Sequence, residues 1–536
     1  MAFNRRQFLA RGAGVVGAAA LVGCGNSVET LTAGTGGGGS APGPRTRDYT
    51  LRAQLAENTL GTQQVTTTTY NGALCGPVLR VRQGERLRVQ LINDLPAINA
   101  QGENIPSLPY VTNLHTHGLH VSPKAPSDDI FLEIAPGEEF TYIYDIPFTQ
   151  PSGTLFYHPH RHGSVANQMW GGMGGALIIE GEIDEVPEIK AAREEVFVIG
   201  EVRVDSEGQQ PPFTANFVTY LQAAPAVYPI NGKLAPEYFA RPGEVVRFRV
   251  VHSGVGNYIN LNVTEHDMHV YSYDGITIEE LESESNVVLA PSNRVDFLLR
   301  AGAPGTYQIK SLPYDQGFGP NPEVVLATFV VAGEPIEMGL PTTLPAPFTH
   351  IEESEITNRR TLTFDVGPSS AEQPVATFKI NDQMFSDERV DQYVELGSVE
   401  EWTIHNTSDE DHPFHIHVND FEVVQIGDMV LDRPRWHDTF TLPPNSFIKF
   451  RTRFEEFPGR YVLHCHILFH ECIGMMQVVD VVPQTMTRLE RSLRVMVSQG
   501  LIEKMNSSAL AATAENCAPP PAMQFRWGGP RPRREA

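Results

Sequence analysis

Ten of the chain's 18 histidines fall in four short clusters whose spacing suggests metal binding. The clusters are HTH at 115–117, HPH at 158–160, HPFHIH at 412–417 and HCHILFH at 464–470. On a β-strand, residues i and i+2 point to the same face, roughly 6–7 Å apart, so neighbouring rings can bind different metal ions of one cluster. A single pair of this kind is more often two hydrogen-bonded core histidines. Four clusters, two in each of two regions of the chain, predict a metal site that both regions share.

Cys465 lies between two of these histidines, His464 and His466. On a strand, its side chain points away from the face that carries the two rings. The sulfur can therefore bind one metal centre while the flanking rings bind another, and the backbone between them is a short covalent path for electrons. The sequence predicts two metal centres joined through Cys465.

The centre that contains the cysteine has the donor set of a blue copper site. Such a site combines a thiolate, two imidazoles and a weak, distant thioether. Its predicted ligands are His412, Cys465, His470 and Met475. Two alternatives stay open for the thioether: Met476 takes the axial place, or Met475 is an ordinary core methionine.

Three stretches of the chain share one pattern, a turn at asparagine followed by a glycine that begins an alternating strand. The asparagines and glycines are Asn71 and Gly84, Asn231 and Gly243, and Asn381 and Gly397. In the first two repeats, apolar residues alternate with polar ones as in half-buried antiparallel strands, at Leu87, Val89, Leu91, Val246, Phe248 and Val250. A repeat of this length indicates duplicated domains rather than a solenoid.

The repeat sets the predicted domain organisation. The 46 glycines, 41 prolines and scarce helical periodicity indicate an all-β protein. We expect three β-sandwich domains over residues 45–182, 183–342 and 343–482. Residues 483–536 are expected to form a short amphipathic helix and a tail rich in proline and arginine.

The N-terminus reads as an export segment. Residues 1–23 combine Arg5 and Arg6 with a short apolar run, which is typical of a twin-arginine signal and too short to span a bilayer. Cys24 follows Leu-Val-Gly, as in a bacterial lipobox, and residues 24–44 form a flexible Gly-rich linker. We expect a periplasmic or cell-surface protein anchored by a lipid on Cys24. An ordinary cleaved signal is the alternative.

The net charge indicates which kinds of partner the protein can bind, and the cysteines raise the question of a disulfide. The formal net charge of −24 argues against nucleic-acid binding and would concentrate cations near the surface. An oxidising compartment would permit a disulfide between Cys75 and Cys517, and free thiols are the alternative.

The four histidine clusters resemble the four copper-binding motifs of the multicopper oxidases, the laccase-like family, and in particular its three-domain bacterial members. The resemblance covers nearly the whole chain after the export segment. It implies three cupredoxin-like Greek-key β-sandwiches and four copper ions, one of type 1, one of type 2 and two of type 3. The ligands carried over are His115 and His415 for type 2, His117, His158 and His466 for one type 3 copper, His160, His417 and His464 for the other, and the blue copper set for type 1. In the run HPHRH, His162 is an alternative to its neighbours.

Reduction of dioxygen consumes protons, so the resemblance also implies carboxylates near the copper ions. Asp128 follows the first cluster and Glu471 follows His470. Asp129 is the rival of Asp128, and either acid could instead only orient an imidazole through a hydrogen bond. For Asp438 we expect either a place at the rim of the type 1 site or an exposed loop.

The implied activity is a copper-dependent oxidase that couples four one-electron oxidations of phenols, aromatic amines or similar donors to reduction of dioxygen to two waters. The alternative is an oxidase of Cu(I), Fe(II) or Mn(II) that serves copper tolerance or metal homeostasis. No methionine-rich insert is present among the 13 methionines, which lowers the weight of a cuprous oxidase. A copper-binding protein without turnover and a copper-free scaffold are weaker alternatives. We expect a monomer whose partners are dioxygen and a small-molecule or metal-ion electron donor.

Overall fold

The computed structural model describes residues 44–97, 110–210, 224–317, 319–367 and 376–483. The predicted export segment, the linker up to residue 43, and the C-terminal helix and tail lie outside the described residues. In the part of the chain that is described, no helix is long and apolar enough to cross a bilayer.

The first sandwich consists of two four-stranded sheets, ordered β2-β1-β4-β6 and β3-β8-β7-β5. The elements are β1 (Thr46–Leu60), β2 (Gln63–Tyr70), β3 (Leu79–Arg82), β4 (Arg86–Asn93), β5 (His115–His117), β6 (Glu139–Asp145), β7 (Gly153–His158), α1 (Val165–Trp170) and β8 (Gly175–Glu180). In β4 the predicted alternation is confirmed, because Leu87, Val89 and Leu91 are fully buried. They pack with Leu177 of the opposite sheet in one core.

The middle sandwich follows two short helices, η1 (Glu182–Glu185) and α2 (Pro187–Ala191). Its sheets are ordered β16-β15-β18-β13-β9 and β12-β20-β19-β14-β17, and β10 and β11 form a separate ribbon. The strands are β9 (Arg193–Gly200), β10 (Val202–Arg203), β11 (Ala226–Val227), β12 (Glu237–Ala240), β13 (Val245–Ser253), β14 (Ile259–Val263), β15 (Met268–Tyr273), β16 (Ile276–Glu284), β17 (Asn286–Leu289), β18 (Arg294–Arg300), β19 (Gly305–Leu312) and β20 (Val324–Val331).

The third sandwich has sheets ordered β22-β21-β24-β29-β26-β27 and β23-β31-β30-β25-β28. Its elements are η2 (Glu353–Glu355), β21 (Asn358–Gly367), β22 (Thr377–Ile380), β23 (Gln392–Glu395), β24 (Val399–Asn406), β25 (His412–Ile416), β26 (Phe421–Ile426), β27 (Met429–His437), β28 (Thr439–Leu442), β29 (Ser446–Arg453), β30 (Gly459–Cys465), α4 (Leu468–Ile473) and β31 (Met476–Val482). The boundaries proposed for the three domains remain predictions.

The sequence repeat corresponds to one turn that occurs in each sandwich. Asn71, Asn231 and Asn381 have φ angles of 55°, 51° and 54°, in the left-handed region that asparagine tolerates. Each side-chain oxygen accepts a hydrogen bond from a backbone N–H of an earlier strand, at 2.7, 2.9 and 2.9 Å. The turn is therefore hydrogen-bonded to the first strand of every sandwich in the same way.

Two details of the predicted repeat strands are wrong. The strands β4, β13 and β24 are not purely antiparallel, since each pairs in parallel with the first strand of its sandwich. The chain crosses to the opposite sheet between the paired strands, which permits parallel pairing. In addition, β13 is buried on both faces, where Arg247 pairs with Asp184 and Arg249 pairs with Asp184 and Glu194.

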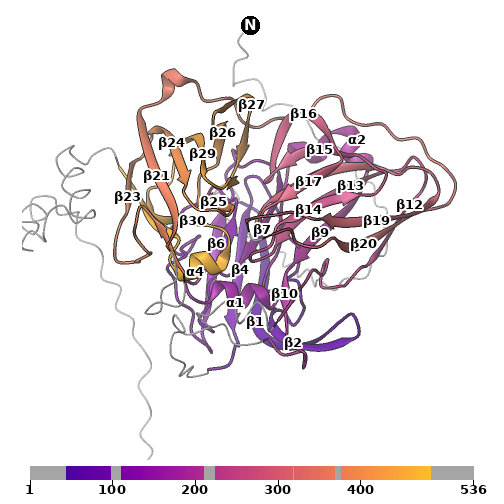
Figure 1. Ribbon diagram of the computed structural model, residues 1–536, viewed down its shortest axis with the longest axis horizontal. Helices are drawn as coiled ribbons and strands as arrows, with labels where there is room; N and C mark the ends of the chain where they lie inside the picture. The colour runs from indigo at the N-terminus through magenta and orange to yellow at the C-terminus, as the bar shows by residue number, and fades with distance from the viewer. Residues whose placement is uncertain (1–43, 98–109, 211–223, 318, 368–375, 484–536) are drawn as a thin grey trace, which may run out of the picture. The chain divides into compact units, whose positions relative to one another are not determined.

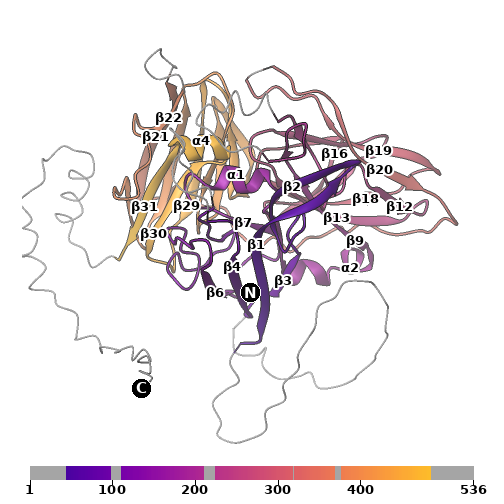
Figure 2. The same cartoon turned by 90° about the horizontal axis from the view of Figure 1, so that it is seen from below.

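The first and third sandwiches share part of one hydrophobic core. That core includes Val165 and Met169 of α1 together with Leu468 and Cys472 of α4. Figures 1 and 2 show α1 and α4 next to each other, although about 300 residues separate them in the sequence. The histidine clusters of the two sandwiches lie close to this contact.

Candidate metal centre

One group of side chains, here called the cysteine site, consists of His412, Cys465 and His470. Cys465 Sγ lies 3.5 Å from His412 Nδ1 and 3.6 Å from His470 Nδ1. His412 begins β25, Cys465 ends β30 and His470 lies in α4, and all three are fully buried. The structure thus brings together three of the four residues of the predicted blue copper set through their ligand atoms.

The position of the two methionines separates the alternatives for the fourth. Met475 packs in the same core as Cys465, and its backbone oxygen accepts a hydrogen bond from the Cys465 N–H at 3.1 Å. Met476 packs in a different cluster with Ile130 and Val462. Met475 shares a core with Cys465 and Met476 does not, so the packing favours Met475.

The outer edges of the two imidazoles face a carboxylate that the sequence analysis missed. Glu410 Oε1 lies 3.7 Å from His412 Nε2 and 3.9 Å from His470 Nε2. The Glu410 side chain is only 8% exposed, and burial and then Asp411 raise its pKa to about 7. The acidic run DED directly before His412 was the available clue.

The second group, here called the histidine site, collects the eight remaining predicted histidine ligands. Antiparallel pairing sets His115 opposite His158 and His415 opposite His464. The ligand atoms form three groups, each within 4.8 Å, consisting of His115, His117 and His415; His117, His158 and His466; and His160, His417 and His464. The second and third groups have the composition expected for two type 3 coppers, and the first includes both residues expected at type 2.

Unsatisfied ring nitrogens show that these residues fit metal ions. Four rings each have one nitrogen in a hydrogen bond: His115 to Asp128, His158 to the Pro159 carbonyl, His415 to the Asp438 carbonyl and His117 to the Asp438 carboxylate. The second nitrogen of each is buried without a partner among the described residues. Burial lowers the pKa of all eight rings well below the usual value, which keeps them neutral. Neutral imidazoles with free lone pairs are the donors that copper takes.

Asp128 lies against the first histidine of the site. Its Oδ2 is 2.7 Å from His115 Nδ1, and its Oδ1 accepts hydrogen bonds from the Thr116 N–H and hydroxyl. Burial raises the pKa of Asp128 to about 7, although the Thr116 hydrogen bonds oppose the shift. The rival Asp129 instead accepts the Phe131 N–H at 3.1 Å.

Glu471 lies behind two other rings of the histidine site. Its Oε2 is 3.1 Å from His464 Nδ1, and its Oε1 is 3.7 Å from His160 Nδ1. The side chain is fully buried, and burial raises its pKa well above the usual value. The shift favours the protonated form of this carboxyl group beside the histidine site.

Both predictions for Asp438 are wrong. The side chain is 3% exposed, so it is no surface-loop acid, and it lies at the histidine site rather than the rim of the cysteine site. Its Oδ1 accepts a hydrogen bond from His117 Nε2 at 3.0 Å, and its carboxylate binds Arg294 of the middle sandwich. The contact depends on how all three sandwiches meet, which the local sequence does not contain.

Two other residues, His162 and Cys75, are not part of the metal-binding groups found among the described residues. The His162 ring packs against Phe385 at 4.7 Å between centroids, and His162 belongs to none of the metal-binding groups found among the described residues. Cys75 is a free thiol within the described residues, and Cys517 lies outside them, so that pairing remains a prediction.

A cysteine between two imidazoles, joined through its own backbone to an eight-histidine site between β-sandwiches, defines a copper-dependent oxidase. Three family profiles described as multicopper oxidase match residues 53–183, 206–333 and 355–485. The chain belongs to the multicopper oxidase family.

Individual relatives agree with this assignment. A multicopper oxidase of Staphylococcus aureus is 25% identical over 457 residues, which cover 81% of this chain and 88% of the relative. A laccase of Bacillus subtilis is 24% identical over 470 residues, covering 77% and 89%. The solved structure of a Campylobacter jejuni multicopper oxidase, described as a metallo-oxidase, matches with a TM-score of 0.69 and 25% identity over 83% of this chain and 96% of that one.

Proposed function

We propose that this protein is a laccase-like oxidase that takes single electrons from phenols, aromatic amines or similar donors and reduces dioxygen to two waters. The position of Cys465 carries the proposal. Its sulfur faces His412 and His470, while its neighbours His464 and His466 belong to the histidine site. Bound copper would supply the one-electron redox chemistry and the site of dioxygen reduction.

The residues divide into two proposed ligand sets. His412, Cys465, His470 and Met475 would hold one copper ion at the cysteine site. The eight residues of the histidine site would hold the other three: His115, His117, His158, His160, His415, His417, His464 and His466. The Cys465 backbone links the two sets without a gap.

Asp128 and Glu471 are the proposed proton donors. Both carboxyl groups are buried, and they lie 2.7 and 3.1 Å from ring nitrogens of His115 and His464. Raised pKa values keep a proton available at neutral pH. Each can therefore donate a proton at the histidine site, becoming a carboxylate as it does so.

Oxygen uptake by the copper-loaded protein tests the proposal. We expect a blue protein with four tightly bound copper ions that consumes one dioxygen for every four molecules of a phenol or aromatic amine oxidised. A colourless protein, or one that holds copper without oxygen uptake, would contradict the proposal.

Glu410 favours a second candidate function, oxidation of a metal ion. Its Oε1 is buried without a hydrogen-bond partner among the described residues and lies on the outer side of both imidazoles of the cysteine site. Asp411 follows it, and neither of these two acids pairs with a lysine or arginine in the described part of the chain. Such an edge attracts a cationic donor more than a neutral phenol.

Replacing Glu410 with glutamine separates the two donors. We expect the KM for Fe(II), Cu(I) or Mn(II) to rise about 10-fold, the equivalent of about 1.4 kcal/mol, with little change for a neutral phenol. Asp409→Asn is the matched control, because Asp409 is exposed and bound to Asn445. Equal effects on both donor classes would remove Glu410 from donor selection.

We also propose that the protein is exported by the twin-arginine route, anchored through a lipid on Cys24, and monomeric. The arginine pair and the lipobox in residues 1–24 support the first two parts. Mass spectrometry of the mature N-terminus tests the lipid, and sedimentation of the copper-loaded protein tests the monomer. An unmodified cleaved N-terminus would exclude the anchor.

A further inference from the structure

Arg294 contacts all three sandwiches from the interior of the molecule. It begins β18, and its side chain is fully buried. Its Nε donates to the Thr154 carbonyl of the first sandwich at 3.3 Å. The two terminal nitrogens donate to the Ser292 and Asp274 carbonyls of the middle sandwich, both at 2.8 Å. The remaining two N–H groups bind both carboxylate oxygens of Asp438 in the third sandwich.

All five N–H groups of the guanidinium are therefore used. A bidentate pair between arginine and a carboxylate fixes the plane of the carboxylate as well as its distance. Asp438 cannot rotate without losing one of these bonds. The middle sandwich thus determines the orientation of a carboxylate in the third sandwich.

Asp438 transfers this orientation to two rings of the histidine site. Its Oδ1 accepts a hydrogen bond from His117 Nε2. His117 Nδ1 is buried without a hydrogen-bond partner among the described residues, and His117 belongs to two of the metal-binding groups. Its backbone oxygen accepts a hydrogen bond from His415 Nδ1 at 2.7 Å. The side chain and backbone of one residue therefore fix rings from two different sandwiches.

Close packing around Arg294 and Asp438 restricts the movement of both side chains. Gly118, next to His117, has a φ of +89°, and a Cβ there would lie 2.9 Å from Asp438 Oδ2 and 3.0 Å from an Arg294 nitrogen. The guanidinium also lies 5.8 Å from the centre of the Phe156 ring, which stacks on His158. The ion pair and the histidine site form one packed unit.

We propose that Arg294 is a positioning residue for the histidine site, by which the middle sandwich holds the ring of His117 in its metal-binding orientation through Asp438. The inference rests on the proposed function, because it concerns the copper that this site would hold. It gives the middle sandwich a role beyond spacing the outer two, although no described residue of that sandwich belongs to a metal-binding group.

Arg294→Lys tests the proposal, since lysine keeps the charge and loses the bidentate geometry. We expect copper binding at the histidine site to weaken by about 10- to 100-fold, the usual cost of losing a residue that orients a metal-bound histidine. Competition with a chelator measures the affinity. The near-ultraviolet absorption of the copper pair at the histidine site, to which His117 would contribute, should also change, while the blue absorption of the cysteine site stays as in the wild type.

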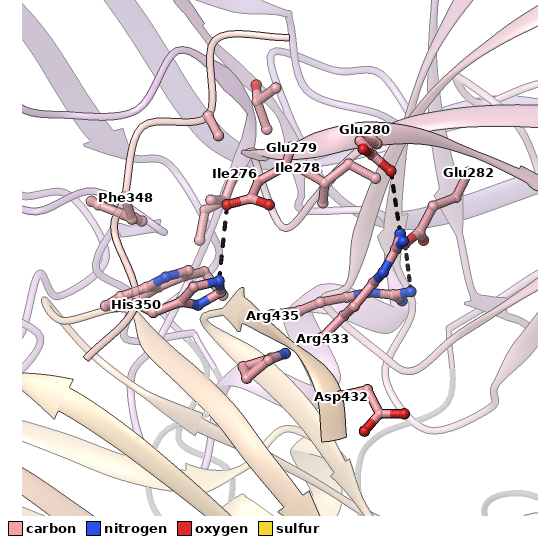
Figure 3. Close-up of a pocket in the computed structure, with 14 residues that line it drawn as sticks. Ile276, Ile278, Glu279, Glu280, Glu282, Phe348, His350, Asp432, Arg433 and Arg435 are labelled. Atoms are coloured by element: carbon pink, nitrogen blue, oxygen red, sulfur yellow. Dashed lines mark hydrogen bonds and ion pairs between the residues drawn. The ribbon is translucent and has the colours of Figure 1, made fainter. Parts of the chain in front are cut away.

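Two control variants distinguish positioning from general stability. Arg249→Lys disturbs another fully buried arginine, which binds Thr154 and the acids Glu194, Asp184 and Asp296 but no histidine. Arg435→Lys weakens an ion pair with Glu282 that, like the pair of Arg294 with Asp438, links the middle and third sandwiches. It lies at the wall of a cavity of about 260 Å³ (Figure 3). We expect both controls to change the melting temperature at most and to leave the copper spectra unaltered.

Asp438→Asn provides a second test that does not depend on the folding of the arginine variant. It keeps the side-chain shape and should reproduce the spectral change of Arg294→Lys. The double variant should add nothing to it, because both act through the same contact. Wild-type protein that binds no copper would overturn the proposed function as well. If the wild-type protein binds copper normally but the copper spectrum of Arg294→Lys matches the spectra of the two controls, only this inference is overturned.

Discussion

At the residue scale, the site depends on which nitrogen of each buried ring is occupied. His115 is held through Nδ1 by Asp128, while His117 is held through Nε2 by Asp438. In both rings, the other nitrogen is buried without a hydrogen-bond partner among the described residues, and both residues belong to metal-binding groups. The residues that orient the rings therefore matter almost as much as the ligands themselves.

Asp128→Asn should slow turnover without loss of colour. The substitution keeps a polar contact with His115 but removes the exchangeable carboxyl proton, and general acid catalysis typically contributes at least about 100-fold. We therefore expect oxygen consumption to fall by about that factor with the blue absorption unchanged. The neighbouring Asp129→Asn serves as the matched control, because Asp129 only accepts a backbone N–H. Turnover equal to the wild type would exclude Asp128 from the mechanism.

Glu194 should make a pH-dependent contribution to stability. Burial raises its pKa, but Arg249 and Arg80 outweigh burial and hold the pKa at about 2. A depressed pKa stabilises the fold above the unfolded value of about 4.5, and the stabilisation is lost as the pH falls to about 2. Glu194→Gln should cost about 3 kcal/mol at pH 7.

Denaturant unfolding at several pH values measures the effect of Glu194→Gln. The difference from wild type should shrink as the pH falls below about 4.5. Glu57→Gln is the control, because Glu57 lies on the surface of β1. A difference that stays constant with pH would show that packing, and not charge, is responsible.

At the element scale, the sandwiches meet through strands and turns that approach unusually closely. Gly153 begins β7, and a Cβ at this position would lie 2.0 Å from the Gly275 carbonyl oxygen in the turn between β15 and β16. A backbone atom cannot move away from a new Cβ as easily as the end of a flexible side chain can. The absence of a side chain at residue 153 therefore allows the first and middle sandwiches to touch, one strand away from Arg294.

Gly153→Ala should destabilise the protein by about 1–3 kcal/mol or more, because it overpacks a backbone contact. The melting temperature of the copper-loaded protein measures the cost. Gly200→Ala is the matched control at the end of β9, where the new methyl group would meet Pro229 at an ordinary 3.7 Å. Equal melting temperatures for the two variants would show that the sandwiches separate at this contact at little cost.

At the whole-molecule scale, the histidine site joins sandwiches that are far apart in the sequence. His115, His117, His158 and His160 come from the first, and His415, His417, His464 and His466 from the third. A metal ion bound by both sets can exist only when the two sandwiches are together. Copper binding and the docking of the outer sandwiches are therefore linked.

Removal of copper should lower the melting temperature. A ligand that binds only the folded state stabilises it by about 4 kcal/mol when its free concentration is 1,000 times Kd. Calorimetry of copper-loaded and chelated protein measures the difference, and readdition of copper should restore it. Identical transitions with and without copper would contradict a site shared between the sandwiches.

The sequence by itself determined the all-β class, the three repeated units and the candidate ligands. These depend on local relations: the i, i+2 spacing of histidines on a strand, the asparagine turns, and Cys465 between two rings. Spacing of this kind survives folding, because a strand preserves the direction of each side chain relative to its neighbours.

Only the tertiary structure decided which residues hold the ligands in place. Asp438 meets His117 across 321 positions of the sequence and Arg294 across 144, and Glu410 faces two imidazoles from β25 and α4. Burial of Arg247 and Arg249 on an apparently half-exposed strand has the same origin. Such contacts form where the surfaces of distant elements pack together. The pattern of residues along one strand does not predict which surfaces will pack.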